Sequence, residues 1–138
     1  MKNISLREAV KFHGHLGPYL ILGLLAGNYA LKKLKCKKYF SLDVSVCGAI
    51  QKPKSCLVDG LQLSTGATYG KGNIRRLNGR KISIICRNVK NDKRISLQLN
   101  KDLAQRLAEL KGHRKSESFA RGLLKINPRD LFNLSTKE

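Results

Sequence analysis

The sequence predicts an α+β fold with N-terminal helices, a central antiparallel sheet and C-terminal helices. Apolar residues recur at helical spacing up to about residue 35, alternating and β-branched runs occupy the middle, and helical spacing returns after Leu99. The chain has 138 residues, of which 41% are hydrophobic, and this is enough for one core. We therefore expect a single domain over residues 1–138.

Two helices are predicted at the N-terminus. Ser5 followed by Glu8 is typical of a capping box, which favours a helix over Leu6 to His13. Pro18 suits the first turn of a second helix, over Tyr19 to Lys35, because its missing N–H would have no partner there. The break between the two helices places two histidines at a helix junction.

The second predicted helix carries a close-packing signal. Gly23 and Gly27 form a small-xxx-small step, which allows another helix to approach within the monomer or across a dimer, and we favour packing within the monomer. The uncharged stretch from Leu16 to Leu31 is shorter than the ~20 residues that span a bilayer. We expect a buried helix and no membrane association.

Strands and one short helix are predicted in the middle of the chain. Partial alternation favours a strand within Phe40 to Ile50, and helical spacing favours a short helix over Cys56 to Ser64, followed by a glycine-rich loop. The runs Lys81 to Asn88 and Arg94 to Leu99 indicate a hairpin with its turn at Asn91-Asp92.

Helices are predicted again at the C-terminus. A helix from Lys101 onward is expected to stop at Gly112, and a last helix is expected over Ser116 to Ile126. The apolar residues Leu131, Phe132 and Leu134 are expected to pack as a tail.

The chain is strongly basic. Its formal net charge is +19, from 28 Lys and Arg residues against 9 Asp and Glu residues, and such an excess attracts nucleic acids and other polyanions. The basic residues are dispersed, however, and four Tyr and four Phe are few rings for stacking bases. A solvated basic surface is the alternative interpretation.

The four cysteines, at positions 36, 47, 56 and 86, form no CxxC pair. This spacing excludes a zinc ribbon and argues against a disulfide framework. Reduced thiols, together with an N-terminus that turns polar without a secretory signal, predict a cytoplasmic protein. Core packing is the default expectation for Cys36, Cys47 and Cys86.

Metal-ligating residue types gather around the predicted helix junction. His13 and His15 can converge if the backbone turns at Gly14, and a helix N-terminus would favour the thiolate of Cys56. Imidazole and thiolate suit zinc-like metals, and two or three protein ligands leave an open position. The alternative is a hydrogen-bonded junction histidine and a small core cysteine.

Polar residues of the predicted short helix and loop can surround such a site. Asp59 and Gln62 share one helix face, where they can orient a ligating histidine or hold a substrate, although Asp59 also simply suits a helix N-terminus. The loop from Thr65 to Asn73 lacks the spacing of a phosphate-binding loop. It is either a plain turn or an anion-binding nest with Lys71 as the counter-charge.

Two runs of the sequence carry a family resemblance. Phe12 to Pro18 reads Phe-His-Gly-His-Leu-Gly-Pro, and Cys56 to Asn73 reads Cys-Leu-Val-Asp-Gly-Leu-Gln-Leu-Ser-Thr-Gly-Ala-Thr-Tyr-Gly-Lys-Gly-Asn. These runs resemble the FmdE-like family of formylmethanofuran dehydrogenase components, with Phe-His-Gly-His-x-Cys-Pro and Cys-x-Val-Asp-x-x-Gln-x-x-Thr-Gly-Cys-Thr-x-Gly-Lys-Gly-Asn. The motif core spans about residues 5–98, and a looser helical part spans about residues 99–138.

The resemblance implies an α+β core, often dimeric, with a metal-binding active site. His15 and Cys56 would then be metal ligands, and His13 would be a further ligand or a nearby acid-base group. The candidate catalytic residues are His13, Cys56 and Asp59. The residues that would line the pocket and bind a ligand are Gln62, Thr68, Lys71 and Asn73.

Two residues depart from the family pattern. Gly17 and Ala67 stand where the family has cysteines, and the loss of two thiols weakens the affinity for soft metals. Our hypothesis is a cytoplasmic homodimer that binds a divalent metal ion, with zinc the best match. It would also bind a small or cofactor-like ligand in one-carbon or molybdenum and tungsten enzyme metabolism. The alternatives are a nucleic-acid-binding protein on the same scaffold and a metal-free adaptor.

Overall fold

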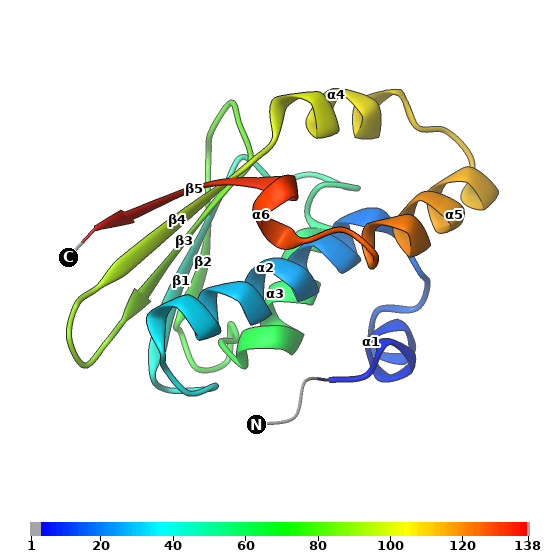
Figure 1. The fold of residues 1–138 in the computed structure, drawn as a ribbon. Helices are drawn as coiled ribbons and strands as arrows, with labels where there is room; N and C mark the ends of the chain where they lie inside the picture. The colour runs from blue at the N-terminus through cyan, green and yellow to red at the C-terminus, as the bar shows by residue number, and fades with distance from the viewer. Residues whose placement is uncertain (1–3, 138) are drawn as a thin grey trace.

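The computed structural model describes residues 4–137 (Figure 1). Within that range the chain forms six helices and five strands. In chain order they are α1 Leu6–His13, α2 Pro18–Leu34, β1 Leu42–Cys47, α3 Cys56–Thr65, β2 Ile74–Leu77, β3 Ser83–Asn88, β4 Arg94–Leu99, α4 Lys101–Glu109, α5 His113–Leu123, α6 Pro128–Leu131 and β5 Phe132–Lys137. The predicted α+β class is confirmed.

The strands form one sheet in the order β2-β1-β3-β4-β5. Its three pairings from β1 to β5 are antiparallel, as predicted. β2 runs parallel to β1, so the sheet is mixed rather than antiparallel throughout. The reason is that α3 lies between these two strands in the chain, and a crossover helix returns the chain in the same direction.

Two edge strands were missing from the sequence prediction. β2 is short, and Ile74 is its one buried residue, so no alternating pattern marks it. β5 occupies the segment expected to be a packed tail: Phe132 is buried, but Asn133 to Thr136 are exposed. Backbone pairing with β4 makes this segment a strand, and pairing without burial leaves no hydrophobic signature.

The helices lie to one side of the sheet. Figure 1 shows them gathered on the right, with the sheet on the left. In β1 and β3 buried residues alternate with half-buried ones, as expected for strands with one face in the core. Helix α2 contacts both β3 and β4 and lies at the centre of that core.

The first two helices begin and end as the sequence predicts. Ser5 and Glu8 form the capping box of α1, with the Glu8 N–H donating to Ser5 Oγ. Gly14 ends α1 with a φ of 105°, a conformation that side chains other than glycine rarely adopt. Pro18 starts α2, so residues 14–17 form the short junction expected to carry the two histidines.

The middle and C-terminal elements differ from the prediction at their ends. β1 lies within Phe40 to Ile50, as predicted, and Gly48 follows its last residue with a φ of 76°. The hairpin of β3 and β4 is confirmed, and Asp92 turns it with a φ of 62°. α4 ends at Glu109, so Gly112 does not stop it. Gly112 instead precedes α5, which begins at His113 rather than at Ser116.

Helices α2 and α3 touch through their backbones. A Cβ on Gly23 would meet the Leu57 carbonyl oxygen and lie 2.8 Å from the Gly60 Cα. A Cβ on Gly27 would meet the Ser64 side chain, whose hydroxyl donates to the Gly23 carbonyl at 3.0 Å. The predicted glycine step therefore packs within the monomer.

Within residues 4–137, no helix is both long enough and apolar enough to cross a membrane.

The glycine contact predicts a stability difference between two alanine substitutions. Gly23→Ala should destabilise the protein by about 2 kcal/mol, because the methyl group forces apart two helices that have no room for it. Gly122→Ala, in α5, meets open space and should be neutral or stabilising by about 0.5 kcal/mol. Urea unfolding followed by circular dichroism measures both, and equal stability of the two variants would contradict the packing described.

Candidate metal centre

His13 is the most enclosed polar side chain of the helix junction. It is the last residue of α1, and 8% of its side chain is exposed. Its Nδ1 lies 2.6 Å from Asp59 Oδ2 in α3. Because an ionised carboxylate only accepts, the hydrogen bond places a proton on Nδ1, and the tautomer with its one proton there presents the Nε2 lone pair. Nε2 is buried without a hydrogen-bond partner among residues 4–137.

The second histidine and the cysteine converge on the first. The rings of His13 and His15 have centroids 4.7 Å apart, tilted by 48°. One ligand atom from each of His13, His15 and Cys56 lies within 4.8 Å of the other two. The turn at Gly14 therefore brings together two rings that a continuous helix would separate, as predicted.

These three side chains fit a zinc-like ion. Zinc lies about 2.0 to 2.3 Å from its ligands in a tetrahedral arrangement, so the ligand atoms on one ion are about 3.3 to 3.8 Å apart. The three ligand atoms in the structure lie within 4.8 Å of one another, so they must close by about 1 Å around an ion, and the exposed His15 side chain has room for this movement. The unpartnered Nε2 of His13 is the feature that an ion would satisfy. A hydrogen bond from the other ring nitrogen to a carboxylate is the usual support of a ligating histidine.

Cys56 begins α3, as predicted, but its thiolate is not favoured in the metal-free chain. Burial raises the pKa of the Cys56 thiol, and the negative charge of Asp59 raises it further. The positive charge of Lys52 lowers this pKa without reversing the shift. A coordinated metal ion would displace the proton, because its charge stabilises the thiolate directly.

The other thiols lie outside this cluster. All four cysteines are free. Cys86 is fully buried, and burial raises the pKa of its thiol to about 12, so it is an inert core residue. Cys36 packs against the core, whereas Cys47 is half-buried on the outward-facing side of β1 and does not fill the core as expected.

A family comparison covers this whole arrangement. The model of the family described as FmdE, molybdenum formylmethanofuran dehydrogenase operon, matches residues 12–132. The chain belongs to the FmdE family. The matched range contains both histidines of the junction, Cys56 and Asp59, so the resemblance of the two runs is confirmed.

A solved structure shows the same fold. A tungsten formylmethanofuran dehydrogenase FmdE-like protein from Syntrophus aciditrophicus superposes with a TM-score of 0.68 at 19% sequence identity. The superposition covers 96% of this chain and 70% of that chain.

A curated relative matches only in part. A probable S-adenosyl-L-methionine-binding protein from Archaeoglobus fulgidus is 34% identical over 70 residues. The match covers 50% of this chain and 19% of that protein, so the chain corresponds to a small part of its length.

The two departures from the FmdE pattern lie in different surroundings. A Cβ on Gly17 would lie 3.1 Å from His15 Cε1 and 3.4 Å from His15 Nδ1, so this position adjoins the metal ligands. Ala67 is fully buried, and its N–H donates to Thr65 Oγ1 at 3.1 Å. A cysteine at position 17, as in the family pattern, would therefore lie beside His15.

The four predicted ligand-binding residues take part in hydrogen bonds within the loop. Gln62 Oε1 accepts the Tyr69 N–H at 3.1 Å, and Asn73 Oδ1 accepts the Thr68 N–H at 3.0 Å. Lys71 Nζ lies 3.1 Å from Thr68 Oγ1. Gln62 also lines the cavity that contains His13 and Cys56, whereas Thr68, Lys71 and Asn73 do not line it. A ligand-binding role for these residues stays a prediction.

A third histidine, His113, approaches the site from α5. Its ring centroid lies 6.4 Å from that of His15, with the rings nearly perpendicular. Both histidines, together with Gly17, line a cavity of about 290 Å³. Sequence analysis missed His113, because Gly112 was interpreted as the end of a helix rather than as the residue before the next one.

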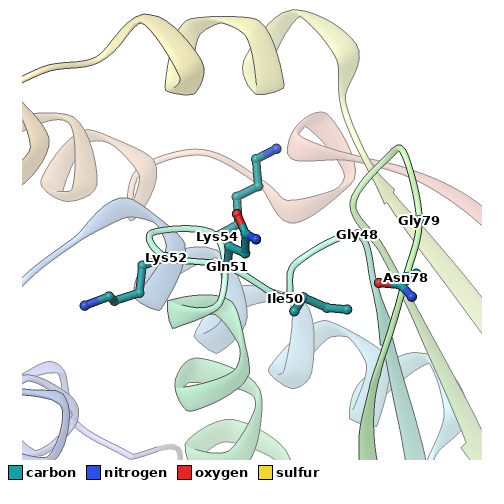
Figure 2. A pocket seen from close by; sticks show the side chains of 7 residues that line it. All are labelled: Gly48, Ile50, Gln51, Lys52, Lys54, Asn78 and Gly79. Carbon is teal, nitrogen blue, oxygen red and sulfur yellow. The ribbon is translucent and has the colours of Figure 1, made fainter.

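Two cavities meet at Lys52. One, of about 390 Å³, contains His13, Cys56 and Asp59, together with Lys52 and Arg76. The other, of about 450 Å³, is lined by Gly48, Ile50, Gln51, Lys52, Lys54, Asn78 and Gly79 (Figure 2). The second cavity is lined by no His, Cys, Asp or Glu side chain, whereas the first contains the candidate metal ligands His13 and Cys56.

Proposed function

We propose that this protein binds a divalent metal ion, with zinc the best match, through His13, His15 and Cys56. Three protein ligands leave one position for water or a substrate, which is the arrangement of catalytic rather than structural zinc sites. The observation that carries the proposal is the buried Nε2 of His13, which has no hydrogen-bond partner among residues 4–137 and points to an ion. Such an ion polarises a bound carbonyl or lowers the pKa of bound water.

The proposed setting follows from the family. Membership in the FmdE family supports a role beside formylmethanofuran dehydrogenase, in one-carbon or molybdenum and tungsten enzyme metabolism. The open position of the ion would receive a small or cofactor-like ligand. Asp59 would orient His13, and the candidates for proton transfer are His13, Cys56 and Asp59 themselves.

We also propose a cytoplasmic homodimer. Four free cysteines fit a reducing compartment. A dimer would use a surface other than the Gly23–Gly27 step, because α3 already covers that step within the monomer. Exposed apolar side chains such as Phe12 and Phe40 are available for such a contact.

Loss of metal on substitution of the ligands tests the proposal. Protein purified without an affinity tag should contain about one zinc ion per chain, and His13→Ala, His15→Ala and Cys56→Ala should each lose most of it. Asp59→Asn should weaken zinc binding by about 10- to 100-fold, because it removes the charge that orients and polarises His13. Elemental analysis by mass spectrometry and competition with a chromophoric chelator measure these changes.

Cys47→Ala is the matched thiol control and should keep its metal, since Cys47 lies outside the cluster. Equal metal content in the wild type and all three ligand variants would remove the proposed site. A wild type that binds no metal at all would favour the metal-free adaptor.

A thiol restored beside His15 should strengthen the site. Gly17→Cys places a sulfur next to the imidazole after a shift of a few tenths of an ångström, for which the exposed His15 ring has room. Zinc affinity should rise by at least about tenfold, since outer-shell partners alone change it by about 10- to 100-fold. Stronger thiolate-to-metal absorption in the cobalt-substituted protein would accompany the change. Gly17→Ser, which lacks a soft ligand, should show neither effect, and a similar gain in both variants would argue against coordination.

Nucleic-acid binding is a second candidate function, favoured by an aromatic and basic patch made of Lys38, Tyr39, Phe40 and Lys71. Phe40 is 77% exposed and Tyr39 is 53% exposed. Lys71 Nζ lies 5.6 Å from the Phe40 ring centroid, and Lys38 Nζ lies 5.5 Å from that of Tyr39. Exposed rings flanked by cations suit the stacking of unpaired bases.

Phe40→Ala should weaken binding of single-stranded RNA by about 5- to 100-fold, because one stacking ring is lost. Phe12→Ala, which removes an exposed ring from α1, is the control and should bind like the wild type. Fluorescence anisotropy over a range of salt concentrations measures the affinity, whose logarithm should fall linearly with that of the salt concentration. No binding at low salt would discard this candidate.

A further inference from the structure

We infer that the cavity containing His13 and Cys56 binds a small organic oxyanion, a carboxylate or a phosphate ester, between Lys52 and Arg76. The inference rests on the proposed function, because a metal ion at the same cavity would bind another group of the same molecule. The inference specifies the charge of the ligand and the protein residues that anchor it, neither of which follows from the metal cluster alone.

The charged groups of this cavity are unbalanced in favour of cations. Lys52 and Arg76 both line it, against one carboxylate, Asp59. That carboxylate already accepts the hydrogen bond of His13. Neither Lys52 nor Arg76 forms an ion pair with a carboxylate within residues 4–137. The cavity therefore lacks an anion that its two cations would pair with.

Arg76 is held in place without being neutralised. Its Nη1 donates to the Ile50 carbonyl at 3.3 Å, and its guanidinium carbon lies 5.8 Å from the Tyr69 ring centroid. A guanidinium has five N–H donors, and a fork of two fits a carboxylate or a phosphate. The remaining donors of this exposed guanidinium are thus available to an oxyanion.

The preceding residue shows what Arg76 lacks. Arg75 donates from both Nη atoms to Asp43, at 3.0 and 2.7 Å. Neighbouring residues of a strand point to opposite faces, so β2 directs one arginine to the open face of the sheet and the other to the metal ligands. The first is neutralised within the chain, and the second is not.

Lys52 brings the second positive charge to the metal ligands. It lines the same cavity as Cys56 and Asp59. In Figure 2 the Lys52 side chain extends away from Ile50 and Asn78, two residues that line the other part of the neighbouring cavity. This position is consistent with its lining both cavities.

The size of the cavity favours a small molecule over a polymer. Its volume of about 390 Å³ lies within the range of small-molecule sites, which is about 300 to 1,000 Å³. A neutral ligand would cover two cations without pairing them, and a cationic ligand would be repelled. An anionic group would pair with both cations, and a second functional group of the same molecule could still bind at the metal position.

The test compares two anions with a neutral molecule of similar shape. Benzoate, phenyl phosphate and benzamide are titrated into uniformly labelled protein, with and without zinc, and binding is followed by backbone and arginine side-chain NMR signals. The wild type should bind both anions and should not bind benzamide. Lys52→Gln and Arg76→Gln should each weaken anion binding by about tenfold or more.

Two matched variants control for the overall charge of the chain. Lys54→Gln removes a lysine that lines the neighbouring cavity but not this one. Arg80→Gln removes an exposed arginine shortly after β2. Both should bind the anions within about twofold of the wild type, since long-range surface charge contributes little at physiological salt. NMR spectra of the free variants verify that each is folded.

The outcomes separate this inference from the metal proposal. Three results would each overturn the inference. They are equal weakening of anion binding in all four variants, an affinity for benzamide as high as that for benzoate, and no anion binding by the wild type. Zinc binding together with any of these results leaves the metal proposal standing alone. Anion binding that depends on Lys52 and Arg76 in a protein that takes up no zinc would sustain the inference and remove the metal proposal.

Discussion

The backbone contact between α2 and α3 is the constraint on which the candidate site depends. Gly23 and Gly60 face each other with no room for a side chain, and a Cβ on Gly60 would meet the Leu20 carbonyl oxygen. This contact places the first turn of α3 beside the first turn of α2. Cys56 starts α3 and His15 lies in the junction before α2, so residues far apart in sequence meet at one point. A glycine on each helix thus fixes the distance between thiol and imidazole.

The hydrogen bond between Asp59 and His13 then gives the site its chemical character. The chain has 9 acidic residues against 28 basic ones, so a partly buried carboxylate is a scarce group. Asp59 fixes the proton on Nδ1 and leaves Nε2 directed at a space with no protein partner among the described residues. The same carboxylate raises the pKa of the Cys56 thiol. It therefore keeps the thiol protonated when the site is empty, and a bound cation would displace that proton.

Sequence analysis could predict the site because its signals are local. The capping box, Gly14 and Pro18 define the junction, and Cys56 with Asp59 defines the helix that meets it. It could not predict the edge strands, since β2 and β5 are set by backbone pairing with neighbours and carry little buried apolar surface. Arg76 was missed with β2, whose side chains carry no burial pattern that marks the strand. His113 was missed because the start of α5 was placed at Ser116, and its approach to His15 depends on the tertiary placement of α5.

The two cavities beside the candidate metal ligands differ in the chemistry of their linings. On the side of α5, Gly17 and His113 line a cavity together with apolar residues such as Leu107 and Leu110. On the side of β2, Lys52 and Arg76 make the opposite cavity positive. A Cβ at position 17 would come within 3.1 Å of His15, which lines the apolar cavity. Glycine at this position therefore leaves the His15 ring free of a neighbouring side chain, at the cost of the soft ligand that the family pattern has there.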